Sequence, residues 1–204
     1  MSVSSFQSGT SLAHSTFSAT NSIYERRQAF TILAYKVHEK NAIKIEYSFI
    51  QQIGQGTFAK VATVNLKALP SEYSNGKATN ELLAMKIIKT NLTHERDIHA
   101  EISGFHRNIV QLKYYFYTSY KGSHYLNLAM EYFPESLHDL ISRYKNNQES
   151  IPHSTRNLFM KNVLSALEYL HGRDICHRDI KSMNILVDMH HYLLKLADFG
   201  SSKN

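Results

Sequence analysis

The sequence predicts an α+β protein in which an antiparallel five-stranded lobe with one helix is followed by the start of a helical lobe. Three observations lead to this prediction. Residues 46–133 contain runs of β-branched and aromatic residues separated by turn residues, a pattern typical of strands. Residues 134–204 change to a helical spacing of apolar residues. Residues 1–45 are rich in Ser and Thr, most clearly over the first 22 positions, and are predicted to form a mostly disordered extension.

The elements of the first lobe follow from local patterns. Residues 43–66, "IKIEYSFIQQIGQGTFAKVATVNL", predict a strand, a tight turn and a second strand, and "ELLAMKII" predicts a central third strand. Between them, "PSEYSNG" at 70–76 predicts a loop with an Asn-Gly turn. A helix near residues 93–104 and strands at "IVQLKYYFY" and "HYLNLAMEYF" complete the lobe. The segment "YERRQAFTILAYKVHEK", residues 24–40, fits a short helix or a strand equally well and stays unassigned.

Two helices open the second lobe, a short one at "SLHDLISRYK" and a longer one at "HSTRNLFMKNVLSALEYLHGR". The longer helix is expected to begin after Pro152 with Ser154 or Thr155 as its cap, and to end at Gly172 in a left-handed conformation. Its apolar stripe is predicted to run through Phe159, Val163, Leu167 and Leu170.

Composition limits the function classes. The chain of 204 residues has no run of eighteen apolar residues, so we expect no membrane span. Its single cysteine, Cys176, suits a reducing compartment, which predicts a cytoplasmic or nuclear protein. The net charge of +6 suggests an anionic partner such as a nucleotide or a phosphopeptide. No basic run is dense enough to favour nucleic acid.

The residues that point to chemistry begin with "IGQGTFAKV". Its glycines lie in a predicted hairpin and not at the start of a helix, which argues against a dinucleotide site. Gly54 and Gly56 would let the backbone approach phosphate oxygens, because neither has a Cβ. Lys86 stands in the centre of the apolar third strand, where an ammonium group needs an anionic partner. Downstream come "HRDIKSMN" on a loop and "LADFG" after a short strand.

These four motifs, in this order, resemble a eukaryotic protein kinase. The resemblance implies a phosphotransferase that uses ATP and Mg²⁺ to phosphorylate protein substrates. It assigns proton acceptance from the substrate hydroxyl to Asp179, contact with the transferred phosphate to Lys181, and contact with the α and β phosphates to Lys86. Asn184 and Asp198 would supply oxygen ligands for the metal.

The same resemblance implies a slot for the adenine ring. Met130 corresponds to the gatekeeper, and Glu131 and Phe133 belong to the hinge that bonds through main-chain groups. The nucleotide-contacting residues are predicted to include Ile53, Val61, Ala84 and Leu186, together with the two glycines and Lys86.

The runs "KYYFY", "YLNLAMEYFPESL", "ICHRDIKSMNIL" and "LKLADFGSSK" resemble the glycogen synthase kinase-3 family, in the proline-directed branch of Ser/Thr kinases. That family recognises substrates that are already phosphorylated nearby, through a pocket of three basic residues. The matching positions are Arg96, Arg178 and Lys203. Arginine suits this role because its fork of N–H groups binds phosphate in a bidentate manner.

The sequence departs from the kinase pattern in its glycine-rich loop and at the acid that should pair with Lys86. Ala59 replaces the third glycine of the loop. Counting back nine residues from His106 (106 − 9 = 97) selects Asp97 as the acid, which keeps Arg96 in the phosphate pocket. A rival register selects Glu101 and places Phe105 in the apolar spine.

A third departure is that the chain ends at Asn204, soon after "DFG" and before the segments that form a kinase's peptide-docking surface. We therefore expect Phe159 or its neighbours to be exposed, with weak nucleotide binding and little phosphorylation by these residues alone. The alternative function is that of a truncated, catalytically incompetent fragment that binds nucleotide or acts as a scaffold.

Overall fold

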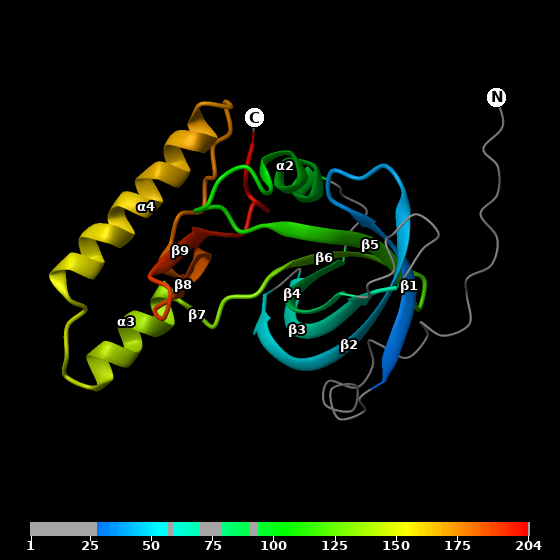
Figure 1. Ribbon diagram of the computed structural model, residues 1–204, viewed down its shortest axis with the longest axis horizontal. Coiled ribbons are helices and arrows are strands. Elements are labelled where there is room, and N and C mark those ends of the chain that lie inside the picture. The colour runs from blue at the N-terminus through cyan, green and yellow to red at the C-terminus, as the bar shows by residue number, and fades with distance from the viewer. Residues whose placement is uncertain (1–27, 57–58, 70–78, 90–93, 204) are drawn as a thin grey trace.

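The computed structural model describes residues 28–56, 59–69, 79–89 and 94–203. They form a β-barrel that carries one helix on its outside, followed by a second part made of two helices and a small sheet (Figure 1). This arrangement confirms the predicted α+β class and the change from strands to helices along the chain. The predicted disorder at 1–22 and the predicted loop at 70–76 lie outside the described residues.

Six strands close the barrel in the order β1-β2-β3-β4-β6-β5, and every neighbouring pair is antiparallel. Five of them match the predicted strands. Their bounds are β1 Ala29–Lys36, β2 Ala42–Gln55, β3 Ala59–Ala68, β4 Thr79–Lys89, β5 Leu112–Tyr120 and β6 Ser123–Glu131.

Strand β1 corrects the sequence analysis, which placed residues 1–45 in a mostly disordered extension. The segment "AFTILAYK" alternates buried and exposed residues along its middle, with Phe30 and Ala34 pointing into the barrel. This period-2 pattern is that of a strand with one buried face. It pairs with β2 over seven residues and with β5 at Tyr35 and Lys36, so it closes the barrel.

Large side chains from all six strands fill the barrel interior. Phe116 and Tyr47 pack at its centre with their ring centroids 5.3 Å apart, and Val64, Leu83 and Met85 surround them. Burial of this apolar surface is the main contribution to the stability of the lobe. The core therefore fixes the positions of β3 and β4, the strands on which the functional residues stand.

Helix α2, His94–Ile102, lies outside the barrel and joins it to the second part. Its Ile98 and Ile102 belong to the core of the second part, whereas Ala100 packs against Leu112, Leu126 and Leu128 of the barrel. A helix of nine residues is marginal in isolation, so these contacts set its position.

The second part contains the helices α3 and α4 and a sheet ordered β7-β8-β9. Helix α3 begins with a capping box, in which the Ser136 side chain accepts from the Asp139 N–H and Asp139 accepts from the Ser136 N–H. The bounds are β7 Glu135–Ser136, α3 Leu137–Asn146, α4 His153–His171, a 3₁₀ turn η1 Ser182–Asn184, β8 Ile185–Asp188 and β9 Leu193–Leu196.

Both predicted caps of α4 are wrong. The helix begins directly after Pro152, whose fixed φ suits the start of a helix, and Ser154 and Thr155 lie inside its first turn. Gly172 is right-handed, with a φ of −65°. The left-handed residue is Asp174, two positions later.

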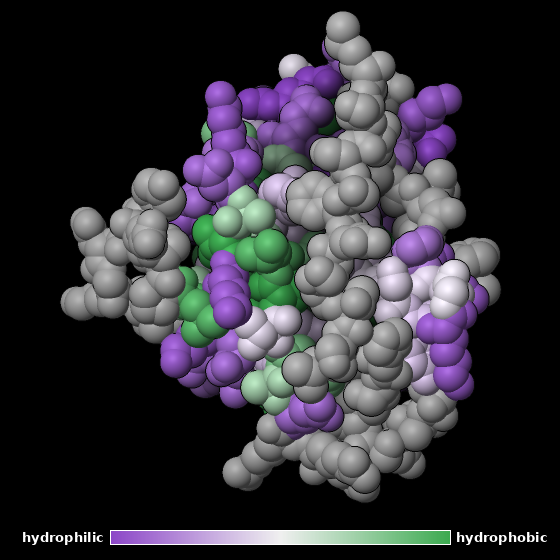
Figure 2. Space-filling model, turned by 90° about the vertical axis from the view of Figure 1, so that its right-hand side faces the viewer, coloured by the Kyte–Doolittle hydropathy of each residue, from purple (hydrophilic) through white to green (hydrophobic). Residues whose placement is uncertain are grey.

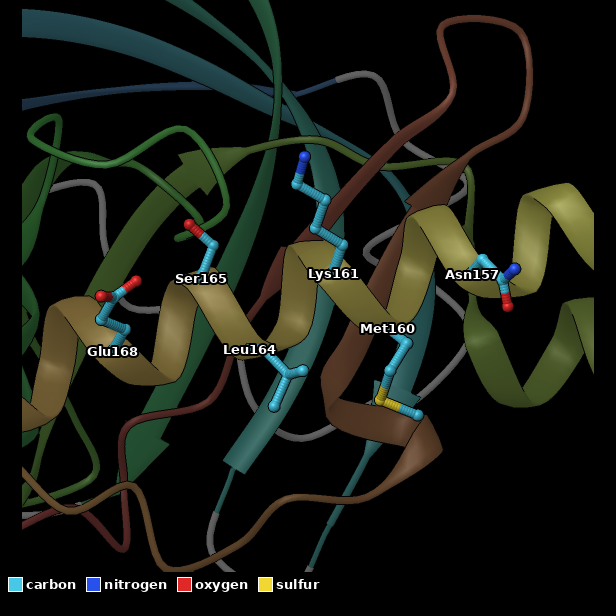
Figure 3. Close-up of a pocket in the computed structure, with 6 residues that line it drawn as sticks. All are labelled: Asn157, Met160, Lys161, Leu164, Ser165 and Glu168. Atoms are coloured by element: carbon cyan, nitrogen blue, oxygen red, sulfur yellow. The ribbon is translucent and has the colours of Figure 1, made fainter.

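One face of α4 packs on the rest of the second part, while the other is open. The sequence analysis expected Phe159 or its neighbours to be exposed, and Phe159 itself is buried. Met160 and Leu164 are 61% and 57% exposed, so the expectation holds for the neighbours alone. Figure 3 shows these two side chains on the outer side of α4, where they line a hollow together with Asn157, Lys161, Ser165 and Glu168. None of the helices in the described ranges combines the length and the apolar composition that a bilayer crossing requires.

The structure makes a testable prediction about β1. Phe30→Ala removes a buried ring that stacks on Tyr47 and meets Phe49 edge-on. We expect the free energy of unfolding to fall by about 3 kcal/mol, from lost transfer energy and a residual cavity. Urea denaturation measures this, with Thr31→Ala on the exposed face of the same strand as the control. Equal stabilities of the two variants would show that β1 is not part of the core.

Candidate active site

Lys86 stands in the middle of β4, opposite Val61 on β3 and Leu128 on β6. Its side chain is only 13% exposed. Such a site is unfavourable for an ammonium group unless anionic groups compensate for the lost hydration. The sequence analysis predicted that need correctly.

Two carboxylates compensate Lys86. Its Nζ donates to Glu95 Oε1 at 2.6 Å and to Asp198 Oδ1 at 2.9 Å. Glu95 is also 13% exposed, so this ion pair is largely shielded from water. The contact joins β4, α2 and the segment that follows β9.

The predicted partner of Lys86, Asp97, is therefore wrong, and so is its rival Glu101. Asp97 is exposed and pairs with Arg96, while Glu101 lies on the exposed side of α2. The count of nine residues back from His106 failed because the acid stands eleven residues before it (106 − 95 = 11), two more than assumed. The rival register also fails, because Phe105 is exposed instead of filling the spine.

The electrostatics keep Lys86 and Asp198 ionised. Burial alone would lower the pKa of Lys86, but the carboxylates of Glu95 and Asp198 outweigh it and raise that pKa. Burial would raise the pKa of Asp198, yet the neighbouring Lys86 ammonium lowers it below its ordinary value. At neutral pH the ammonium and the Asp198 carboxylate are both charged.

The loop "HRDIKSMN" brings Asp179, Lys181 and Asn184 into contact. Lys181 Nζ donates to Asp179 Oδ2 at 2.7 Å, and Asn184 Nδ2 donates to the same oxygen at 2.8 Å. The hydrogen bond from Lys181, followed by that from Asn184, lowers the pKa of Asp179. Asp179 is thus held as a carboxylate with one fixed oxygen.

Backbone conformation supports this arrangement. Arg178 and Asp198 both have left-handed φ values, 62° and 64°, which are uncommon for residues with a Cβ. The surrounding contacts hold them there: Arg178 Nε donates to the Ser201 carbonyl at 2.6 Å, and the Gly200 N–H donates to Asp198 Oδ1. Residues in such conformations concentrate at functional sites.

The predicted metal ligands fit a hard divalent cation such as Mg²⁺. Asn184 directs its Nδ2 to Asp179, which leaves its carboxamide oxygen Oδ1 for another partner. Asp198 uses Oδ1 for Lys86 and Gly200. Within the described residues, no hydrogen bond occupies Asn184 Oδ1 or Asp198 Oδ2, so both are available as oxygen ligands.

The residues predicted to contact the adenine ring lie on adjacent strands. Gly54 is paired with Val61, and Ala84 with Met130, so these predicted contacts come from β2, β3, β4 and β6. Ile53 is partly exposed on β2, and Leu186 comes from β8 in the second part. The Gly56 N–H donates to the Ala59 carbonyl at 2.8 Å, and Ala59, which stands where a third glycine was expected, is the first residue of β3.

The two predicted hinge residues differ in the contacts of their main-chain N–H groups. Glu131 donates its N–H to the Gln111 carbonyl, and its side chain accepts from Lys195. Phe133, just beyond β6, has no protein acceptor for its N–H in the described part of the chain. This N–H is available to a ligand, so the main-chain bond at Phe133 stays a prediction.

The three basic residues predicted to bind a phosphate do not come together. Arg178 and Lys203 lie on segments joined by a β-bridge between Cys176 and Lys203. The Arg96 guanidinium instead contacts Asp97 and the Tyr117 hydroxyl and lies over the Tyr115 ring. The residue on α2 that does reach this C-terminal segment is His94, whose Nε2 donates to the Ser202 carbonyl at 2.9 Å.

Sequence reasoning also missed His99. This histidine is 1% exposed, its Nε2 donates to the Val110 carbonyl at 2.8 Å, and its ring lies 5.0 Å from that of Phe199. Glu95 is one turn earlier on α2, and Asp198 directly precedes Phe199. His177 contacts Phe199 as well, so two buried histidines fix the aromatic residue beside the metal-ligand candidate. The sequence feature that could have indicated His99 is its four-residue spacing from Glu95, which places both residues on one face of the helix.

His99 predicts a pH dependence of stability. Burial lowers its pKa from 6.5 to about 4, so the unfolded chain binds more protons between these values and the folded state loses stability as the pH falls through them. The free energy of unfolding should decrease between pH 7 and pH 4, by about 3 kcal/mol more in the wild type than in His99→Gln.

Denaturation at a series of pH values tests this prediction. His138→Gln, which removes an exposed histidine on α3, is the matched control and should leave the pH dependence unchanged. Parallel curves for the wild type and His99→Gln would contradict the account of His99.

Comparison with known proteins identifies the family of this chain. The model of the protein kinase domain family matches residues 47–204. Protein kinase gsk3 of Schizosaccharomyces pombe is 34% identical over 162 residues, which cover 78% of this chain and 40% of that relative. The chain thus spans well under half the length of this relative, and the match includes the strand lysine, the catalytic loop and the DFG segment. The chain belongs to the protein kinase family and is similar to glycogen synthase kinase-3.

Proposed function

We propose that this chain carries the ATP-binding and phosphoryl-transfer residues of a protein serine/threonine kinase similar to glycogen synthase kinase-3. The observation that carries the proposal is the double contact of Lys86 with Glu95 and Asp198. A lysine held by two carboxylates at the mouth of an apolar slot is oriented for nucleotide phosphates without being neutralised.

In this proposal Asp179 acts on the hydroxyl of a serine or threonine. Its carboxylate accepts the hydroxyl proton while the hydroxyl oxygen bonds to the γ-phosphorus and the bond to the ADP oxygen breaks. The hydrogen bonds from Lys181 and Asn184 occupy Oδ2 of Asp179 and leave Oδ1 for the substrate. Lys181, beside this carboxylate, is placed to contact the transferred phosphate.

Asn184 and Asp198 would hold Mg²⁺ through their free oxygens. The chemistry that the metal would supply there is the neutralisation of negative charge on the phosphates during transfer. The adenine ring would lie between Val61, Ala84 and Leu186, with main-chain bonds to Glu131 and Phe133.

We further propose that substrates include segments that already carry a phosphate. Arg178 and Lys203 are cationic, exposed and on adjoining segments, and His94 lies beside Ser202. This set replaces the one that included Arg96. A cytoplasmic or nuclear location is proposed on the single cysteine alone.

Calorimetric titration with ATP tests the nucleotide site. We expect binding that requires Mg²⁺ and that weakens about tenfold or more in Glu95→Gln, because Lys86 loses the charge that orients it. Asp97→Asn, two residues away on the same helix, is the matched control and should bind as the wild type does. Binding that depends on Asp97 and not on Glu95 would contradict the site.

Phosphoryl transfer separates the kinase from the alternative of a nucleotide-binding scaffold. In the protein at its natural length, Asp179→Asn should retain MgATP binding and lose transfer to a serine peptide by about a hundredfold or more. MgATP binding without any transfer by the wild type would favour the scaffold.

A further inference from the structure

The match to the kinase family model begins at Tyr47. Strand β1 and the turn that follows it come before this residue, so residues 29–46 are outside the match. The hairpin formed by β1 and the first half of β2 is nonetheless built into the barrel. Figure 2 faces this side of the molecule and shows apolar side chains gathered beside hydrophilic ones. Two separate sets of contacts connect the hairpin with α2: one through the Tyr115 ring, and one through residues just after the end of the helix.

The first route is a set of stacked rings near the start of α2. Tyr35 on β1 stacks on Tyr115 of β5, with centroids 5.2 Å apart and an interplanar angle of 16°. The Arg96 guanidinium carbon lies 5.3 Å from the centroid of the same Tyr115 ring. Arg96 is the residue after Glu95 on α2. Tyr35 therefore supports the ring on which the helix places its arginine.

The second route is a clamp at the other end of α2. His38, left-handed with a φ of 68°, donates from Nε2 to the Ser103 carbonyl at 2.8 Å. Its ring also lies 4.9 Å from that of Phe105. Ser103 directly follows the last residue of α2 and is fully buried. The clamp thus satisfies a carbonyl at the helix C-terminus, where no intrahelical donor remains.

The backbone beside His38 strengthens this clamp. The Val37 N–H donates to the Lys113 carbonyl at 3.0 Å, and the Val37 side chain packs in the cluster that includes Ala100 of α2. The hairpin thereby contacts β5 and the apolar cluster against which α2 also packs.

We propose that the N-terminal hairpin is a brace for α2, and that Tyr35 and His38 are positioning residues that keep Glu95 within reach of Lys86. The role in nucleotide binding rests on the proposed function. The proposal that the hairpin holds α2 in position does not rest on that function, because it concerns the helix alone. A helix of nine residues that is tied near Arg96 and at Ser103 cannot swing away from the barrel without breaking one of these contacts.

Hydrogen exchange of the amides in α2 tests the brace directly. The double variant Tyr35→Ala/His38→Asn removes the stacked ring of Tyr35 and the Nε2 group with which His38 reaches the Ser103 carbonyl. Asparagine at position 38 still tolerates the left-handed conformation. We expect protection of the α2 amides to fall about fivefold or more, with the amides of β3 and β6 unchanged. Leu33→Ala, on the same exposed face of β1, is the control and should leave α2 as protected as in the wild type. Unchanged protection of α2 in the double variant, or equal loss in Leu33→Ala, overturns the proposal.

Nucleotide titration gives the second readout. The affinity for MgATP should fall about threefold or more in the double variant. It should stay at the wild-type value in the single variant Tyr35→Phe, which keeps an aromatic ring at position 35 and leaves His38 unchanged. A double variant with a loosened α2 but wild-type MgATP affinity overturns the link to Glu95. If the wild type itself binds no MgATP, the proposed function fails, and hydrogen exchange still decides whether the hairpin braces the helix.

Discussion

The ion pair between Lys86 and Glu95 is the constraint on which the rest of the structure depends. Its two residues come from a barrel strand and from a helix outside the barrel, and Asp198 adds a third segment from the second part. A buried ammonium without these carboxylates would destabilise β4. Lys86 is therefore compensated only when the helix lies against the barrel and the segment after β9 lies against both.

Several packing features serve this one contact. The barrel core fixes the position of β4, and Ala100 of α2 packs against the cluster of Leu112, Leu126 and Leu128 on the barrel. His99 joins the helix to the Val110 carbonyl and to Phe199, so the residue after Asp198 and the residue one turn after Glu95 touch each other. Because the two acids are linked through their neighbours, displacement of α2 would disturb both partners of Lys86 together.

The sequence was sufficient for features that depend on local pattern. Lys86, Asp179, Asn184 and Asp198 lie in short motifs, and the structure brings Lys86 to Asp198 and Asp179 to Asn184. Features that depend on loop length or on distant pairing were not predictable. Glu95 was missed because the stretch before His106 is two residues longer than the count assumed, and Arg96 was misplaced with it. The strand β1 was missed because a short apolar run shows its buried face only when β2 and β5 are beside it.

A double-mutant cycle on the free energy of unfolding tests the central claim most directly, with Lys86→Met and Glu95→Gln measured singly and together in urea. The account predicts a favourable coupling of about 1 to 3 kcal/mol between these residues, and a coupling near zero in the parallel cycle of Lys86→Met with Asp97→Asn. Coupling of Lys86 to Asp97 with none to Glu95 would contradict the arrangement described for α2.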